Sequence, residues 1–183
     1  MESHPLAREV GNNLIITLLP IDEDAIIPEE MAIIEFVSEW FWAGFSLPEY
    51  CDAMEKLDYP RERWARALRS IRRKNRLQCS SQIPFLKLNG VREKSITLLD
   101  PASKHRITSR QDMIAAERSL KESERRVVLE IKKCFSKTLL VPSPYELSQI
   151  MGQVPGTTKN LCTEVLRRFG LEHVYQIPFV FLA

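Results

Sequence analysis

Residues 60–76 read P-R-E-R-W-A-R-A-L-R-S-I-R-R-K-N-R, and this stretch predicts one basic amphipathic helix. At about 100° per residue, the apolar Trp64, Leu68 and Ile71 share one side of that helix. The opposite side gathers Arg66, Arg69, Arg73 and Arg76. Pro60 suits a first helical position because it has no amide hydrogen to leave unpaired. The sequence therefore predicts a helix with one face for burial and one face for a partner.

The arginine-rich side has two interpretations. Charged outer faces are common, so it can be an ordinary solvated surface. A solvated face usually mixes charges of both signs, however, and here Glu62 is the single nearby acid. Unpaired like charges repel, and the phosphates of DNA or RNA would supply the missing counter-charge. The pattern favours nucleic-acid contact over contact with an acidic protein or a membrane surface.

Charge is distributed unevenly along the 183 residues, although the formal net charge is only +2. Residues 1–58 carry about −11, residues 60–94 about +9 and residues 95–183 about +4. With 44% hydrophobic and 27% charged residues, the chain has the composition of a globular protein of one or two small domains. We expect its first domain to be electrically polarised.

Cysteine spacing and hydropathy narrow the class of protein. The four cysteines are far apart, with no C-x-x-C pair and no histidine at ligand spacing, so a structural zinc site is not expected. No cofactor is expected either. Glu2, Arg8 and Glu9 precede any apolar run, which argues against a signal peptide. No apolar run approaches the 18 residues needed to cross a bilayer. We expect a cytoplasmic, nucleoid-associated protein, or a nuclear one if the source is eukaryotic, with reduced thiols.

Two further helices are predicted before residue 60. Residues 14–19 read as a strand, and an acidic linker then leads to a helix from Pro28 or Glu29 to Ala43. Ser46 with Glu49 three residues on is the capping-box pattern, so a short helix is expected over 47–57. A helix, a short helix, a tight turn and a basic helix, in this order, make up the helix-turn-helix arrangement.

A β-hairpin is predicted after the basic helix. Two apolar segments, 83–88 and 95–99, are separated by Asn89-Gly90, the strongest short hairpin signal. Arg92 and Lys94 would make its tip basic, as in the wing of a winged helix. The alternative is an ordinary loop with a turn.

The second half of the chain repeats this three-helix pattern, as architecture rather than as sequence. The expected elements are a linker over 101–110 that includes His105, a helix over 111–135, a short helix capped by Ser143 and ending at Met151, a helix from Thr157 or Thr158 to Phe169, and a terminal strand over 173–182. The outer face of its third helix is of mixed charge. This favours protein contact or dimerisation over DNA contact for the second unit.

Residues 40–71, W-F-W-A-G-F-S-L-P-E-Y-C-D-A-M-E-K-L-D-Y-P-R-E-R-W-A-R-A-L-R-S-I, resemble the helix-turn-helix core of the winged-helix superfamily of DNA-binding proteins. More loosely, residues 33–79, from I-I-E-F-V-S-E-W to L-Q-C, are similar to small bacterial transcriptional activators of the CaiF/GrlA type. Unlike these activators, the chain carries a whole second unit. The resemblance implies that the arginines of the basic helix lie in or beside a major groove and that the wing touches phosphate.

These patterns predict a mainly α (α+β) fold of two tandem winged-helix-like three-helix units, with short β-hairpins or edge strands. The expected division is an acidic segment with a short strand (1–28), a DNA-binding unit (29–100), a linker (101–110) and a second unit for dimerisation or partner binding (111–183).

We expect a transcriptional regulator that binds double-stranded DNA. The alternatives are a protein–protein adaptor, whose acidic N-terminal segment could fold over the arginines, and a replication or partition accessory protein. No catalytic motif is present, so neither an enzyme nor a small-molecule substrate is expected. A homodimer through residues 111–183 is a further expectation. The candidate DNA-binding residues are Arg61, Arg63, Arg66, Arg69, Arg72, Arg73, Arg76, Arg92 and Lys94.

Overall fold

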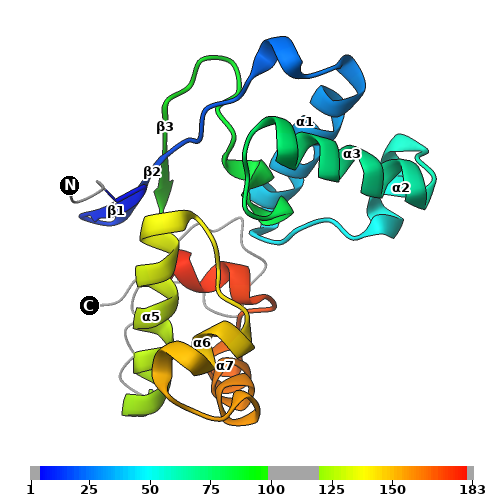
Figure 1. Cartoon of the computed structure of the whole chain (residues 1–183). Coiled ribbons are helices and arrows are strands. Elements are labelled where there is room, and N and C mark those ends of the chain that lie inside the picture. Colours follow the sequence, from blue (N-terminus) through cyan, green and yellow to red (C-terminus); the bar gives the residue numbers. More distant parts are fainter. Residues whose placement is uncertain (1–4, 99–119, 181–183) are drawn as a thin grey trace. The chain divides into compact units, whose positions relative to one another are not determined.

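The computed structural model describes residues 5–98 and 120–180. The chain is mainly helical, with a small three-stranded antiparallel sheet (Figure 1). It divides into an inserted unit, residues 18–92, and a split unit, residues 1–17 with 93–183. These boundaries differ from the expected division after residues 28 and 100, because the chain leaves the split unit after its second strand and returns to it at the third.

Three helices form the inserted unit: α1 (Pro28–Gly44), α2 (Tyr50–Leu57) and α3 (Arg61–Lys74). A short 3-10 helix, η1 (Glu23–Ala25), precedes them, and another, η2 (Ser80–Phe85), follows them. Helix α1 confirms the prediction, and Pro60 caps α3 rather than opening it. Side chains from all three helices and η2 share one core, which includes Ile33, Ile34, Ala53, Trp64, Ile71 and Ile83.

Helix α2 begins later than predicted, because Ser46 is not its cap. Glu49 occupies the N-cap position, and the Asp52 carboxylate accepts the Glu49 amide hydrogen at 2.6 Å. A residue before proline is driven away from helical backbone geometry. Leu47 precedes Pro48 and therefore stays outside the helix.

The sheet belongs to the split unit and consists of β1 (Ala7–Val10), β2 (Asn13–Thr17) and β3 (Glu93–Thr97), in that order. Both pairings are antiparallel, and Leu14 of β2 lies opposite Ile96 of β3. Leu14, Ile16 and Ile96 are buried, as strand alternation requires. Strand β2 confirms most of the strand expected over 14–19.

The hairpin predicted over 83–99 does not form between its two expected strands. Most of 83–88 lies in η2 or in irregular structure, while the segment from Glu93 pairs with β2 instead. Asn89 and Gly90 do make a turn, with φ values of 52° and 75°. The partner of Leu86 beside that turn is Leu19, which comes from before α1.

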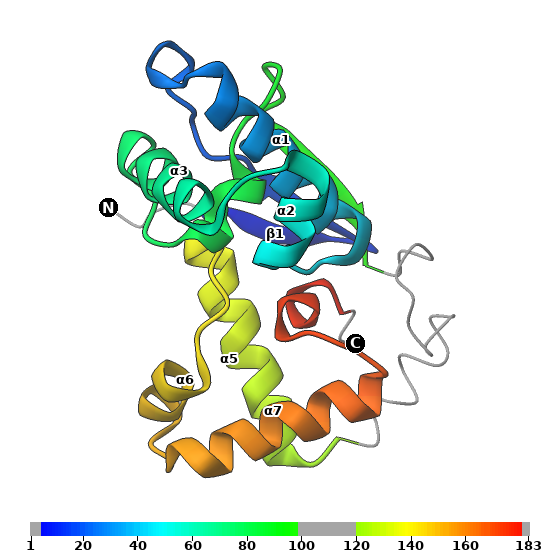
Figure 2. The ribbon, with the colours of Figure 1, turned by 90° about the vertical axis from the view of Figure 1, so that its right-hand side faces the viewer.

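In the split unit, β3 is followed by α5 (Glu122–Thr138), α6 (Pro144–Met151), α7 (Pro155–Phe169) and the 3-10 helix η3 (Val174–Phe179), which packs beside α5 (Figure 2). The capping box of α6 is confirmed: the Ser143 amide donates to Glu146 Oε2 at 2.8 Å, and the Glu146 amide donates to Ser143 Oγ at 3.3 Å. Helix α7 starts at Pro155 rather than at a threonine, because proline is favoured at the first helical position.

The terminal strand expected over 173–182 is wrong, since residues 174–179 form η3. The side-chain oxygen of Gln176 accepts the amide hydrogens of Glu172 and His173, at 2.8 and 2.9 Å, and holds the backbone in a compact turn. The expected linker at 101–110, with His105, and the first part of the helix expected from residue 111 lie outside the described residues.

The two helical sets are repeats of one another in constant register. Residues 27–86, the first repeat, match residues 121–180, the second repeat, with every position 94 residues further along the chain. Gln82-Ile-Pro-Phe85 recurs as Gln176-Ile-Pro-Phe179 and forms a 3-10 helix both times. The repeat is therefore one of sequence as well as architecture, although sparse, and this corrects the expectation.

Several contacts recur at the same offset. The rings of Phe41 and Phe85 meet edge to face at 5.2 Å, and those of Phe135 and Phe179 at 5.6 Å. Backbone φ is positive at the three residues that end the segments of the first repeat, Phe45, Asp58 and Arg76, and at their counterparts Leu139, Gly152 and Gly170. Comparison of the two repeats therefore shows which residues the shared fold does not require.

Candidate nucleic-acid interface

Helix α3 buries one side and exposes the other. Trp64, Ala67 and Ile71 are buried in the core of the inserted unit. With about 100° per residue, Arg66, Arg69 and Arg73 fall within about 60° of one another on the opposite side. All three side chains are exposed. We call Arg66, Arg69 and Arg73 the arginine face.

No acidic side chain in the described part of the chain pairs with the arginine face. Arg61, at the first position of α3, and Arg76, two residues past its end, are exposed in the same way. The structure therefore keeps five of the predicted arginines in and next to α3 available to a partner.

The Arg63 side chain is held by contacts within the protein. Its Nε and Nη2 donate to the two carboxylate oxygens of Glu29 at 2.6 and 2.9 Å, and its guanidinium lies 4.6 Å from the ring centre of Tyr59. The hydrogen bond to Glu29 raises the pKa of Arg63, and the same bond lowers the pKa of Glu29. Arg63 thus fixes the start of α1 to α3 rather than facing a partner.

The Arg72 side chain is also held in part by a contact within the protein. Its Nη2 donates to the backbone oxygen of Gln78 at 2.8 Å, while its buried Nε finds no hydrogen-bond partner among the described residues. Lys74, which the sequence analysis did not single out, donates to the buried Glu30 at 2.6 Å. The signal that could have identified this pair is the recurrence of an acid and a base, Glu124 and Arg168, 94 residues on.

The acidic stretch that runs from Asp22 into the first turn of α1 contacts a different side of α3. The Asp22 amide donates to Asn75 Oδ1, while Glu29 and Glu30 bind Arg63 and Lys74. None of these partners belongs to the arginine face. Within the inserted unit, the acidic stretch leaves that face open.

The two basic residues of the expected wing are separated. Arg92 is exposed and follows the Asn89-Gly90 turn of the inserted unit, where its backbone oxygen accepts the Leu18 amide hydrogen at 2.9 Å. Lys94 belongs to β3 of the split unit and is half-buried, and that burial lowers its pKa. The structure does not bring Lys94 together with α3 in one unit.

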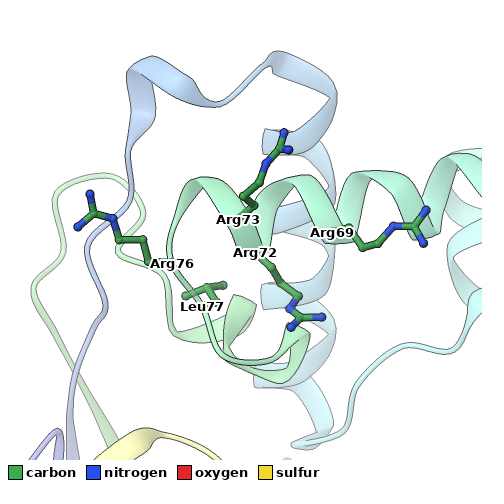
Figure 3. Close-up of a pocket in the computed structure, with 5 residues that line it drawn as sticks. All are labelled: Arg69, Arg72, Arg73, Arg76 and Leu77. Atoms are coloured by element: carbon green, nitrogen blue, oxygen red, sulfur yellow. The ribbon is translucent and has the colours of Figure 1, made fainter.

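A hollow at the C-terminal end of α3 is lined by Arg69, Arg72, Arg73, Arg76 and Leu77 (Figure 3). The guanidinium groups point in different directions: Arg72 toward η2, Arg69 along the helix, and Arg73 and Arg76 away from each other. No acidic side chain is among the lining residues. The hollow is therefore basic, but its guanidinium groups do not converge on one point.

Cys79 lies beside this basic region and is exposed. Burial raises the pKa of its thiol, but hydrogen bonds from Ser81 and the charge of Arg72 outweigh that effect and lower the pKa below its usual range. Burial raises the pKa values of Cys134 and Cys162. Among the described residues no group of side chains could hold a metal ion.

The equivalent surface of the second repeat lacks the arginine face. Asn160, Thr163 and Arg167 stand where Arg66, Arg69 and Arg73 stand, and Gly170 stands where Arg76 does. Arg167 is paired, with Nη2 2.8 Å from Glu164 Oε2. The same helical scaffold therefore forms without an arginine-rich outer face.

Comparison of the chain with protein-family models, with curated protein sequences and with solved structures finds no match. None of the described helices is both long and apolar enough to span a bilayer.

Proposed function

We propose that the chain is a DNA-binding transcriptional regulator whose arginine face contacts double-stranded DNA. Three exposed guanidinium groups without acidic partners in the described residues support this proposal. The planar guanidinium fork can donate two parallel hydrogen bonds to a phosphate, or to the acceptor edge of guanine. DNA would supply the counter-charge that the face lacks.

One observation carries the proposal: the two repeats share residues that build the scaffold and differ at two of the three positions of the arginine face, where Asn160 and Thr163 correspond to Arg66 and Arg69. Both keep a buried glutamate paired with a base, an edge-to-face pair of phenylalanines and the Gln-Ile-Pro-Phe turn. Since α7 folds with Asn160 and Thr163, the fold does not require Arg66 and Arg69. Their presence on α3 is better explained by a ligand than by stability.

The dimensions of α3 suit the major groove. Its fourteen residues span about 21 Å at about 1.5 Å per residue. The major groove of B-form DNA is about 12 Å wide and admits one α-helix. We assign α2 and α3 to the helix-turn-helix of a winged-helix-like unit, in which the Asn89-Gly90 turn stands in place of the wing. Arg92 would then reach phosphate, and Arg61 and Arg76 would flank the groove.

The proposal is tested with the variant Arg66→Gln, Arg69→Gln, Arg73→Gln. Gln is a good helix former, so the helix should persist while three charges are lost. The matched control is Arg167→Gln, the counterpart of Arg73 on α7. Fluorescence anisotropy with labelled duplex DNA should show at least a tenfold loss of affinity for the triple variant and little change for the control. Equal binding by all three proteins would contradict the proposal.

A protein contact through the split unit is the second candidate, and a different observation favours it. Leu129 and Ile150 are 49% and 47% exposed, and the first repeat has Glu35 and Lys56 at these positions. Exposed apolar side chains in place of charges are typical of protein interfaces. If they mediate a homodimer, sedimentation equilibrium should show a dimer for the wild type and a monomer for Leu129→Glu, Ile150→Lys. A wild-type monomer at high concentration would exclude the dimer.

A further inference from the structure

We propose that Glu62 is a specificity-determining residue, whose carboxylate accepts a hydrogen bond from the amino group of a base in the major groove. This inference rests on the proposed DNA contact and concerns the base pair that the same helix selects. Glu62 lies in the first turn of α3 and is exposed.

Glu62 lies on the same side of α3 as the arginine face, one helical turn before Arg66. With about 100° per residue, Glu62 falls between Arg69 and Arg73 around the helix, opposite the buried Ile71. It lies about 16 Å before Arg73 along the helix axis, at about 1.5 Å per residue. A DNA groove that follows this side of α3 from Arg73 back to the start of the helix therefore also passes Glu62.

A carboxylate in that position is unfavourable against phosphate, because like charges repel. It makes no ion pair within the described part of the chain, not even with Arg66 one turn further on. Base edges offer what phosphates do not: the N4 amino group of cytosine and the N6 amino group of adenine are hydrogen-bond donors in the major groove. A glutamate or aspartate carboxylate that accepts a hydrogen bond from the N4 amino group of cytosine is a known major-groove contact.

The fold does not require the acid. Acids in a first helical turn can stabilise the helix dipole, which is the structural alternative for Glu62. The second repeat has Gly156 at the corresponding position, and α7 forms with no acid in its first turn. A recognition helix reads base edges with its N-terminal residues, where Glu62 stands. The ligand is B-form DNA, since the major groove of A-form RNA is too narrow for side chains to read.

The test is selection of binding sites from a random duplex DNA library by three full-length proteins: wild type, Glu62→Ala and Glu35→Ala. Glu35 is the matched control, an exposed acid on α1 whose counterpart is Leu129. Wild type and control should enrich one common motif. Glu62→Ala should lose discrimination at one cytosine or adenine by about 5- to 100-fold, as expected for one good base contact, and should still bind random DNA.

Three results would overturn the inference while the proposed function stands. The first is an unchanged motif and affinity for Glu62→Ala. The second is an unchanged motif with tighter binding of Glu62→Ala to every duplex, which would place the carboxylate against phosphate. The third is wild-type binding without any enriched motif. If the wild type binds no duplex at all, the proposed function itself fails, and the base contact falls with it.

Discussion

The Glu30 carboxylate accepts a hydrogen bond from the Lys74 ammonium group at 2.6 Å and ties the first turn of α1 to the end of α3. The second repeat has an ion pair at the corresponding positions, with Arg168 Nε 2.9 Å from Glu124 Oε2, although this contact lacks hydrogen-bond geometry. Both glutamates are almost fully buried, and both also accept the amide hydrogen of the residue that precedes their helix. Each repeat thus closes its three-helix core with one buried ion pair.

Glu30→Gln should destabilise the inserted unit by about 2 kcal/mol at neutral pH, because Lys74 loses its partner in a half-buried site. All three tryptophans lie in this unit, so urea unfolding followed by tryptophan fluorescence measures the effect. The control is Glu35→Gln on the exposed face of α1, which should change the unfolding free energy by less than about 0.5 kcal/mol. Equal stability of Glu30→Gln and wild type would show that the pair does not hold α1 to α3.

The stabilisation by Glu30 should depend on pH in a defined direction. Burial alone would raise its pKa, but hydrogen bonds from Lys74, Ser70 and the Ile27 amide outweigh burial and hold the pKa below 4.5. Since the folded pKa is depressed, the contribution is fully present above the unfolded value and is lost as pH falls through the folded one. The difference between wild type and Glu30→Gln should therefore shrink below about pH 4.5. A difference that grows on acidification would contradict this assignment.

Gln82→Ala and Gln176→Ala should have matching effects in separate units. Each glutamine oxygen accepts two backbone amide hydrogens, from Gln78 and Cys79 in the first repeat and from Glu172 and His173 in the second. Loss of these acceptors should cost about 1–3 kcal/mol. Hydrogen exchange by mass spectrometry should show faster exchange around η2 for Gln82→Ala and around η3 for Gln176→Ala. Unchanged protection in either variant would argue against the shared turn.

Cys79 should be the most reactive of three cysteines. The pKa of its thiol is lowered, whereas the pKa values of the Cys134 and Cys162 thiols are raised by burial. Because the thiolate is the nucleophile, iodoacetamide at near-neutral pH should label Cys79 first. Ser81→Ala removes a hydrogen bond to the sulfur and should slow that labelling. Peptide mass spectrometry gives the three rates, and faster labelling of Cys134 or Cys162 would contradict the prediction.

The helices of the fold and most of strand β2 follow from local signals, whereas the 3-10 helices and strand β3 do not. Proline, glycine and apolar periodicity near Pro28, Pro144 and Gly170 predict the ends of α1, α6 and α7 within a few residues. The apolar runs around Pro84 and Pro178 resemble strands, but a glutamine side chain holds each in a 3-10 turn. Strand β3 pairs with β2, although the whole inserted unit, residues 18–92, lies between these two strands in the sequence. No local pattern encodes such a pairing.

The sequence predicts where the candidate site lies, but it predicts only some of the residues that form it. Helical periodicity places Arg66, Arg69 and Arg73 on one face, as the structure has them. Periodicity cannot tell that Arg63 is held by Glu29 on another helix, or that Lys94 belongs to a different unit. These assignments depend on tertiary contacts between residues distant in sequence.

The most direct test of the central claim is the salt dependence of binding to random-sequence duplex DNA, for the wild type and for Arg66→Gln, Arg69→Gln, Arg73→Gln. If Arg66, Arg69, Arg73, Arg76 and Arg92 neutralise one phosphate each, the slope of log affinity against log salt should be roughly −4 to −5. Loss of three contacts should reduce it to about −2. Equal slopes for the two proteins, or no binding by the wild type at low salt, would contradict the account.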